Sequence, residues 1–257
     1  MSLKTKILGL SEVMAFDNRW ELLLHRLFFR ATNLHVYRMG GIEAVVDHQL
    51  GDVSGLRTCM TSPMYRALLP LMGLPLRANV LDIGAHVGGF SLMLAVAGVR
   101  PGRFVCVEFN GPTFHRLTFN ITQNIDARKV VLLRAAIGGC SGTLNVSIRP
   151  GSTGASPQPA AGKDTEQIRV LTFDEVIAES GIEGPVDVCK LDVEGAEHDI
   201  FTSGCDNALD RCRNLVIEVH PRNGRGFPEV ESYLRGRNFD LITMAPCKET
   251  VALFRKR

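Results

Sequence analysis

The sequence predicts a doubly wound α/β fold on a mostly parallel, seven-stranded sheet that closes with an antiparallel hairpin. From residue 79 onward, apolar runs of strand length alternate with helical patterns, the order typical of a parallel sheet covered on both faces. Residues 79–91 form an apolar strand that enters a glycine turn and opens a helix, the junction where such sheets hold nucleotide-like ligands. The last two runs, 239–244 and 250–254, lie too close together for a parallel crossover, which predicts the hairpin.

The elements of this sheet follow from local patterns. A pair of accessory strands at 142–148 and 168–170 flanks a loop rich in Gly, Pro and Ser at 149–166, which is either an active-site lid or a linker. The other strands are expected at 79–83, 104–108, 129–134, 186–192 and 214–220, and helices at 88–97, 114–121, 172–179 and 228–235.

Residues 1–75 are expected to form a mainly helical extension, and residues 76–257 the main domain. An amphipathic helix is predicted from 11 to 30 because apolar residues recur there at helical spacing. We expect its stripe to pack on the main domain; a substrate lid, a membrane-surface contact or a homo-oligomer contact are the alternatives. Residues 40–47 suggest a short strand, and residues 1–3 an expression scar. The stripe comprises Val13, Phe16, Trp20, Leu23, Leu24 and Leu27.

Composition bounds the class of protein. The 257 residues, 45% of them hydrophobic, can bury one substantial core. With a formal net charge of only +2, the protein lacks the strong positive electrostatic field that favours binding of nucleic acid. We expect no integral membrane segment and no secretion signal, and therefore a cytoplasmic protein. The seven cysteines contain no C-x-x-C pair, which indicates reduced thiols and no structural zinc site.

The glycine turn distinguishes between ligands. A dinucleotide fingerprint needs a second glycine two positions after the first, but Gly84 is followed by Ala85 and His86. Asp82 places a carboxylate at the strand end, which would repel a pyrophosphate and suits a cationic ligand. S-adenosyl-L-methionine carries an ammonium and a sulfonium and no phosphate. The turn, with Gly88 at the start of the helix, therefore predicts a site for that cofactor.

Glu108 ends the second strand, 26 positions after Asp82. An acid there can accept both hydroxyls of an adenosine ribose, and Asn110 is assigned to the same cofactor site. This ribose occurs in NAD as well, so Glu108 alone does not name the cofactor. Two roles stay open for each turn residue: Asp82 receives the methionine ammonium or bonds the turn's own amides, and His86 contacts the cofactor or caps the helix.

A second polar cluster follows the fourth strand, at residues 190–198. Strand alternation sends Lys190 and Asp192 to one face, and Asp192 and Glu194 reach the ligand crevice. Two neighbouring carboxylates at such a strand end repel each other and lower stability, so their presence indicates a functional role. Glu197 is interpreted as a structural acid of the next helix's first turn, and His198 as a helix-surface histidine.

His220 ends the fifth strand, just before Pro221. It either removes a proton from an acceptor hydroxyl or bonds a neighbouring carboxylate and holds the loop. Asp192, Glu194 and His220 are thus the candidate catalytic residues. The same three could bind a divalent metal, but no H-x-E or H-E-x-x-H spacing supports one, so no metal is predicted.

Five segments in order resemble the FkbM family of methyltransferases across residues 79–220. The glycine turn is similar to the family's D-I-G-A-N-x-G motif, with His86 in place of the usual asparagine. Residues 109–111 interrupt the usual E-P dipeptide. The resemblance implies a Rossmann-like class I methyltransferase that uses S-adenosyl-L-methionine, mainly for O-methylation of sugars and natural-product hydroxyls. The segments are LDIGAHVGGFS (81–91), VEFNGP (107–112) with Asn120, IRVLTFD (168–174), KLDVEGAE (190–197) and LVIEVH (215–220).

Two other functions are weighed against this one. An NAD(P)-dependent oxidoreductase would use a similar sheet, but the missing glycine and the terminal hairpin oppose it. A non-catalytic S-adenosyl-L-methionine-binding scaffold is the other alternative. The expected partner is a small-molecule acceptor whose identity the sequence does not reveal.

Overall fold

The computed structural model describes residues 10–28, 33–146, 165–203, 205–245 and 250–257. At its centre is a seven-stranded sheet with the strand order β11-β12-β10-β9-β3-β4-β5. The strands are β3 (Arg77–Ile83), β4 (Arg100–Val107), β5 (Val130–Leu133), β9 (Val188–Leu191), β10 (Asn214–Val219), β11 (Phe239–Ala245) and β12 (Thr250–Lys256).

The sheet is parallel from β10 to β5, whereas β12 runs antiparallel to both of its neighbours. The predicted fold class and terminal hairpin are therefore confirmed. The chain builds outward from β3 through β4 to β5, and later returns to the other side of β3 with β9 and β10. This reversal places a crevice at the carboxyl ends of β3 and β9, the usual ligand position in open α/β sheets.

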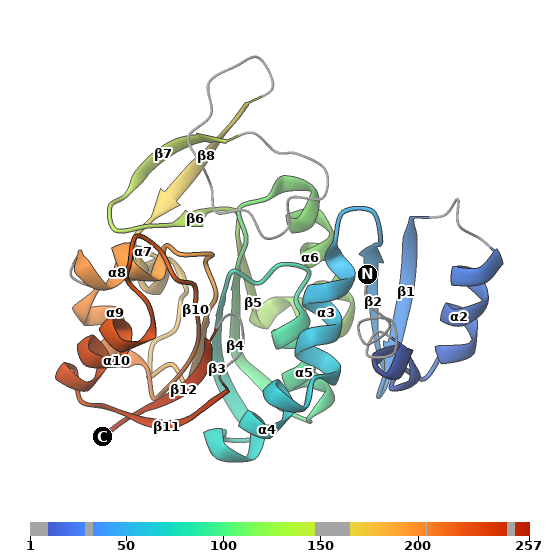
Figure 1. Ribbon diagram of the computed structural model, residues 1–257, viewed down its shortest axis with the longest axis horizontal. Coiled ribbons are helices and arrows are strands. Elements are labelled where there is room, and N and C mark those ends of the chain that lie inside the picture. Colours follow the sequence, from blue (N-terminus) through green and yellow to red (C-terminus); the bar gives the residue numbers. More distant parts are fainter. Residues whose placement is uncertain (1–9, 29–32, 147–164, 204, 246–249) are drawn as a thin grey trace.

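Helices cover both faces of the sheet (Figure 1). Because side chains alternate along a strand, β3 sends Val80 into a core with the first group of helices and Leu81 into a core with the second. The first group is α3 (Asp52–Thr61), α4 (Pro63–Met72), α5 (Gly89–Val96) and α6 (Gly111–Asn124), and the second is α7 (Phe173–Glu179), α8 (Glu197–Thr202), α9 (Asp206–Arg211) and α10 (Phe227–Gly236).

A smaller sheet lies beyond the carboxyl edge of the main one (Figure 1). Strand β8 (Glu166–Leu171) pairs antiparallel with β7 (Gly142–Val146) and parallel with β6 (Ala136–Ile137), which confirms the accessory pair. Most of the predicted loop 149–166, like residues 1–3, lies outside the described residues. Its role as a lid or linker stays a prediction.

The segment before β3 packs tightly against the main sheet. The hairpin of β1 (Leu34–Met39) and β2 (Ile42–Asp47) meets α6 through Asn120. The Asn120 side chain accepts a hydrogen bond from the Val45 amide and donates to the carbonyls of Val45 and Val87. One side chain thus joins the N-terminal hairpin, α6 and the loop that follows β3.

The predicted continuous helix at 11–30 is wrong. Helical turns at 10–14 end in a turn at 15–18, and α2 (Arg19–Phe28) starts afresh. Trp20 and Leu24 are 64% and 53% exposed, so the stripe does not pack as one face. Two polar side chains cause the break: Asp17 accepts from the Gly40 amide, and Asn18 bonds the β1 backbone in both directions.

None of the helices in the described part of the chain combines the length and the apolar character needed to cross a membrane.

Candidate cofactor and acceptor site

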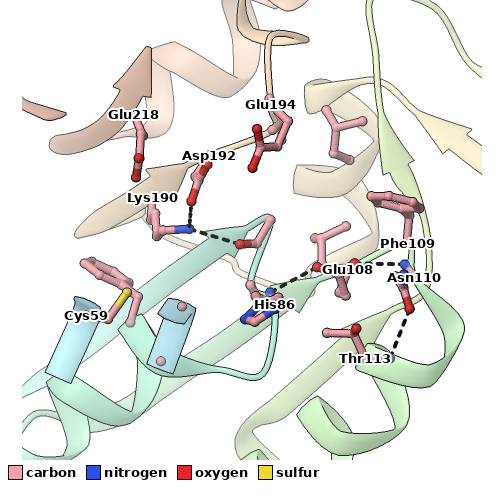
Figure 2. Close-up of a pocket in the computed structure, with 18 of the residues that line it drawn as sticks. Cys59, His86, Glu108, Phe109, Asn110, Thr113, Lys190, Asp192, Glu194 and Glu218 are labelled. Carbon is pink, nitrogen blue, oxygen red and sulfur yellow. Dashed lines mark hydrogen bonds and ion pairs between the residues drawn. The ribbon is translucent and has the colours of Figure 1, made fainter. Parts of the chain in front are cut away.

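A cavity of about 470 Å³ opens where the carboxyl ends of β3, β4, β9 and β10 meet (Figure 2). Its volume lies within the usual range for small-molecule sites. Seven of the ten predicted site residues line it: Gly84, Ala85, His86, Glu108, Asn110, Asp192 and Glu194. The other three, Asp82, Gly88 and His220, do not belong to its wall.

Two glycines make the turn after β3 possible. Gly84 has a φ of 71°, and a Cβ at this position would overlap the carbonyl oxygen of Asp192. Gly88 has a φ of 93° and is the N-cap residue of α5, and a Cβ there would lie 2.9 Å from the Ile121 side chain. At position 84, only glycine therefore lets the end of β3 approach the end of β9 this closely.

Asp82 lies beneath the turn and is fully buried. Its Oδ2 accepts hydrogen bonds from the Ser91 hydroxyl at 2.8 Å and the Ser91 amide at 3.2 Å. Burial raises the pKa of Asp82, which the nearby Lys190 and Ser91 oppose. The carboxylate thus fixes the first turn of α5 instead of facing the cavity.

Lys190 is a buried ammonium at the base of the cavity. Its Nζ donates to the carbonyl of Gly84 and to Oδ2 of Asp192, each at 3.0 Å, and lies 3.9 Å from Asp82 Oδ1. Burial disfavours its charge, but Asp192 and Asp82 outweigh that effect and raise the pKa of Lys190. One cation therefore ties the glycine turn to the end of β9.

His86 occupies the position of the missing glycine with a φ of 53°. Its ring packs so closely on Gly55 of α3 that a Cβ there would overlap it, and its Nε2 lies 3.8 Å from Asp52. Burial lowers the pKa of His86 to about 4, so the ring is neutral. The N-cap residue of α5 is Gly88, and no side chain caps this helix. His86 therefore does not cap α5; it forms part of the cavity wall.

Glu108 and Asn110 form the end of the cavity next to β4. The two carboxylate oxygens of Glu108 accept from the amides of His86 at 3.0 Å and Asn110 at 2.8 Å. Asn110 in turn accepts from the Thr113 amide and caps α6. Burial raises the pKa of Glu108 to about 7, although the backbone N–H groups oppose it. Figure 2 shows both residues facing the same chamber as His86.

The opposite end contains groups that the sequence did not single out. Tyr65 of α4 donates from its hydroxyl to Oε2 of Glu218 at 3.0 Å, and Cys59 of α3 lies in the same wall. Burial, reinforced by the charge of Asp192, raises the pKa of Glu218. With Asp192 and Glu194, this end carries three carboxylates (Figure 2). The sequences of α3 and α4 contain no recognisable motif, so Cys59 and Tyr65 could not be predicted as site residues.

His220 sits behind this acidic end. Its Nδ1 donates to the buried Glu197 at 2.9 Å, while Nε2 lies 3.5 Å from Glu194 and 3.9 Å from Asp192. Burial opposes protonation, but Glu197 and then Asp192 and Glu194 outweigh it and raise the pKa of His220 to about 9. The expectation for His198 is wrong: it is buried, and its Nε2 donates to the His220 carbonyl at 3.0 Å.

Comparison with known proteins decides the family. The family model of the methyltransferase FkbM domain matches residues 82–241, which is more than half of the chain. The chain belongs to this family. The match begins at the carboxylate beneath the glycine turn and ends in β11, so it includes most of the elements that form the cavity.

Relatives of this FkbM-family chain include two curated proteins. It is 27% identical over 195 residues to the 31-O-demethyl-FK506 methyltransferase FkbM of Streptomyces tacrolimicus, covering 63% of the chain and 73% of that protein. It is also 27% identical over 187 residues to the AMB antimetabolite synthetase AmbE of Pseudomonas aeruginosa, covering 58% of the chain. The match spans only 9% of AmbE's length.

A solved structure agrees with the fold. It is titled a putative SAM-dependent methyltransferase from Streptococcus mutans and superposes with a TM-score of 0.51 at 10% identity, covering 88% of this chain and 56% of that one. S-adenosyl-L-methionine is the cofactor of this FkbM-family chain. The cavity suits it: carboxylates at both ends complement a cationic, ribose-containing ligand, whereas the several acids would repel a pyrophosphate.

Proposed function

We propose that this chain transfers the methyl group of S-adenosyl-L-methionine to a hydroxyl oxygen of a small molecule such as a sugar or natural product. The observation that carries the proposal is the two-ended cavity at the switch point of the sheet. One end is built from the strand ends that hold an adenosine in this fold type. The other end presents carboxylates and a phenol, groups that accept and orient hydroxyls.

The donor half would be formed by the glycine turn and Glu108. The Glu108 carboxylate faces the chamber with lone pairs left over from its two amide partners, so it can accept the ribose hydroxyls. Gly84 lets the cofactor approach the backbone, and His86 and Asn110 shape the wall around it. Asp82 and Gly88 do not line the cavity, but they support the donor half by fixing the start of α5.

The acceptor half would be formed by Asp192, Glu194 and the Tyr65–Glu218 pair. When bound, the cofactor supplies a methyl group that its sulfonium charge already activates. The chain therefore mainly aligns the acceptor oxygen with that methyl and receives the hydroxyl proton on a nearby carboxylate. Lys190 holds Asp192 in place for this role.

Calorimetry with S-adenosylhomocysteine tests the donor half. We expect a single site per chain, and we expect Glu108→Gln to weaken binding about 10- to 100-fold, because a hydrogen bond to a charged group contributes roughly 1.5–3 kcal/mol. Glu194→Gln is the matched control, a cavity carboxylate at the other end, and should change affinity less than about threefold. Equal losses in both variants would contradict the division of the cavity. Binding of NAD in place of S-adenosylhomocysteine would support the oxidoreductase instead.

The affinity for S-adenosylhomocysteine should also depend on pH. Because the pKa of Glu108 is raised to about 7, the carboxyl is protonated below that pH and ionised above it. A ribose that binds the ionised form lowers this pKa, so binding should release protons near pH 7 and be tighter at pH 8 than at pH 6. Titrations in buffers of different ionisation enthalpy measure the release. It should disappear in Glu108→Gln, and its persistence there would point to another group.

Self-association through α2 is a further prediction. Trp20, Leu24 and Phe28 recur every four residues and are 64%, 53% and 72% exposed, an apolar stripe of the kind that marks contact surfaces. Light scattering should report a dimer that Trp20→Glu converts to a monomer. A wild-type monomer at all concentrations tested would refute this prediction.

A further inference from the structure

Three side chains with metal-ligating atoms converge at the acidic end of the cavity. Asp192 and Glu194 follow β9, and His220 follows β10. One donor atom from each lies within 4.8 Å of the other two, and no other group of three or more His, Cys, Asp and Glu residues does so within the described ranges. The sequence groups the same three residues but predicts no metal, because they show none of the usual metal-ligand spacings. The structure adds the distances between their ligand atoms, since β9 and β10 are neighbours in the sheet.

The imidazole is oriented as metal-bound histidines usually are. Its Nδ1 donates to Oε1 of Glu197 at 2.9 Å, and this carboxylate is fully buried. That hydrogen bond fixes the ring so that Nε2 faces Asp192 and Glu194. A carboxylate behind the ring is the partner that typically holds a metal-ligating histidine and strengthens its donor nitrogen.

The spacing fits a shared cation better than direct hydrogen bonds. The distances from Nε2 to Glu194 Oε2 and Asp192 Oδ1, 3.5 and 3.9 Å, exceed those of an ordinary N–H···O bond. Two ligands bound at about 2.1 Å to one metal lie roughly 3.0 to 3.4 Å apart in octahedral or tetrahedral geometry. Small rotations of the two carboxylates would bring all three atoms onto one ion.

The oxygens of Asp192 are divided between two partners. Oδ2 accepts from the Lys190 ammonium at 3.0 Å, and Oδ1 faces His220. The lysine therefore leaves one carboxylate oxygen for a ligand. The negative charges of Glu197 and Glu218 nearby add to the attraction for a cation.

We propose that Asp192, Glu194 and His220 bind a divalent cation of the manganese class. Two carboxylate oxygens and one imidazole nitrogen suit Mn²⁺, which accepts both donor types. Because Asp192 and Glu194 line the cavity, the ion lies at its wall with positions left for water or an acceptor oxygen. The site stands on this geometry alone and does not require the proposed methyl transfer.

Manganese itself is the probe. The 257-residue protein is stripped with EDTA and titrated with MnCl₂ by calorimetry, and bound Mn²⁺ is followed by electron paramagnetic resonance. We expect one ion per chain, with affinity lowered at least tenfold by Glu194→Gln and by His220→Ala. Glu197→Gln should lower it by about 10- to 100-fold through the orientation of the ring.

Controls separate a ligand site from a purely structural cluster. Glu231→Gln changes a partly exposed carboxylate of α10 that pairs with Arg235 and should leave Mn²⁺ affinity unchanged. Glu194 is itself 35% exposed, so its variant should fold even if His220→Ala does not. Absence of binding by Mn²⁺, Mg²⁺ and Zn²⁺ to folded wild-type protein, or binding that Glu194→Gln does not weaken, would overturn the proposal.

Discussion

Replacing Gly84 with alanine should destabilise the protein by about 3–5 kcal/mol and weaken S-adenosylhomocysteine binding more than tenfold. A non-glycine residue at a φ of 71° costs about 1–2 kcal/mol by itself. The new Cβ would also overlap the Asp192 carbonyl, which is backbone and cannot move aside by changing rotamer. The end of β9 must therefore shift away from β3, and Asp192 shifts with it.

Thermal unfolding and calorimetry measure both effects. For a domain of this size, the expected loss corresponds to a decrease in Tm of at least about 6 °C. Gly98→Ala is the matched control, because Gly98 also has a positive φ, 86°, but no atom lies within 4 Å of its added Cβ. Gly98→Ala should lose only the roughly 1–2 kcal/mol of stability that a positive φ costs a non-glycine residue. Equal destabilisation by the two variants would show that the contact between the strand ends is not tight.

Lys190→Met should cost about 3–5 kcal/mol of unfolding free energy, since it leaves Asp82 as a buried carboxylate without its cation. It also releases Asp192 and the Gly84 carbonyl, both of which bond the ammonium. Denaturant unfolding measures the loss. Cofactor binding should weaken as well, because the glycine turn and the end of β9 are no longer tied together.

A double variant tests the cause. If the uncompensated charge is responsible, Lys190→Met with Asp82→Asn should be more stable than the sum of the single changes by more than about 1 kcal/mol. Arg169→Met, which removes an exposed pair with Glu179, should cost less than about 1 kcal/mol. Additive effects of the two buried changes would rule out the charge explanation.

The strands and helices of the main domain could be predicted from sequence because each of them depends on a local pattern. Apolar strands, glycine turns and helix patterns follow one another, and the carboxyl ends of parallel strands must meet at one edge. Residues placed directly after a strand, such as Glu108 and Asp192, could be assigned to the cavity for that reason. The short gap between the last two strands settled their antiparallel pairing.

Other parts depend on contacts between distant segments. Tyr65 reaches Glu218 across 153 positions of the chain, from helices that carry no motif. The periodicity of residues 13–27 could not reveal that Asn18 bonds β1 and interrupts the helix. His198 follows a polar helix start, yet the neighbouring strand end covers it and accepts its hydrogen bond.

The wall of the cavity is built partly from two helices and partly from strand ends, and this affects how the choice of acceptor could be altered. Thr58, Cys59 and Tyr65 come from α3 and α4, whereas Glu108 and Asn110 follow β4. A chimera that imports residues 52–72 from a family relative, with Gly55 kept to accommodate the His86 ring, would replace the helical part of the proposed acceptor half. It would leave Asp192, Glu194, Glu218 and the proposed donor half in place. Exchanging this helical pair would therefore measure how much α3 and α4 contribute to the choice of acceptor on an unchanged sheet.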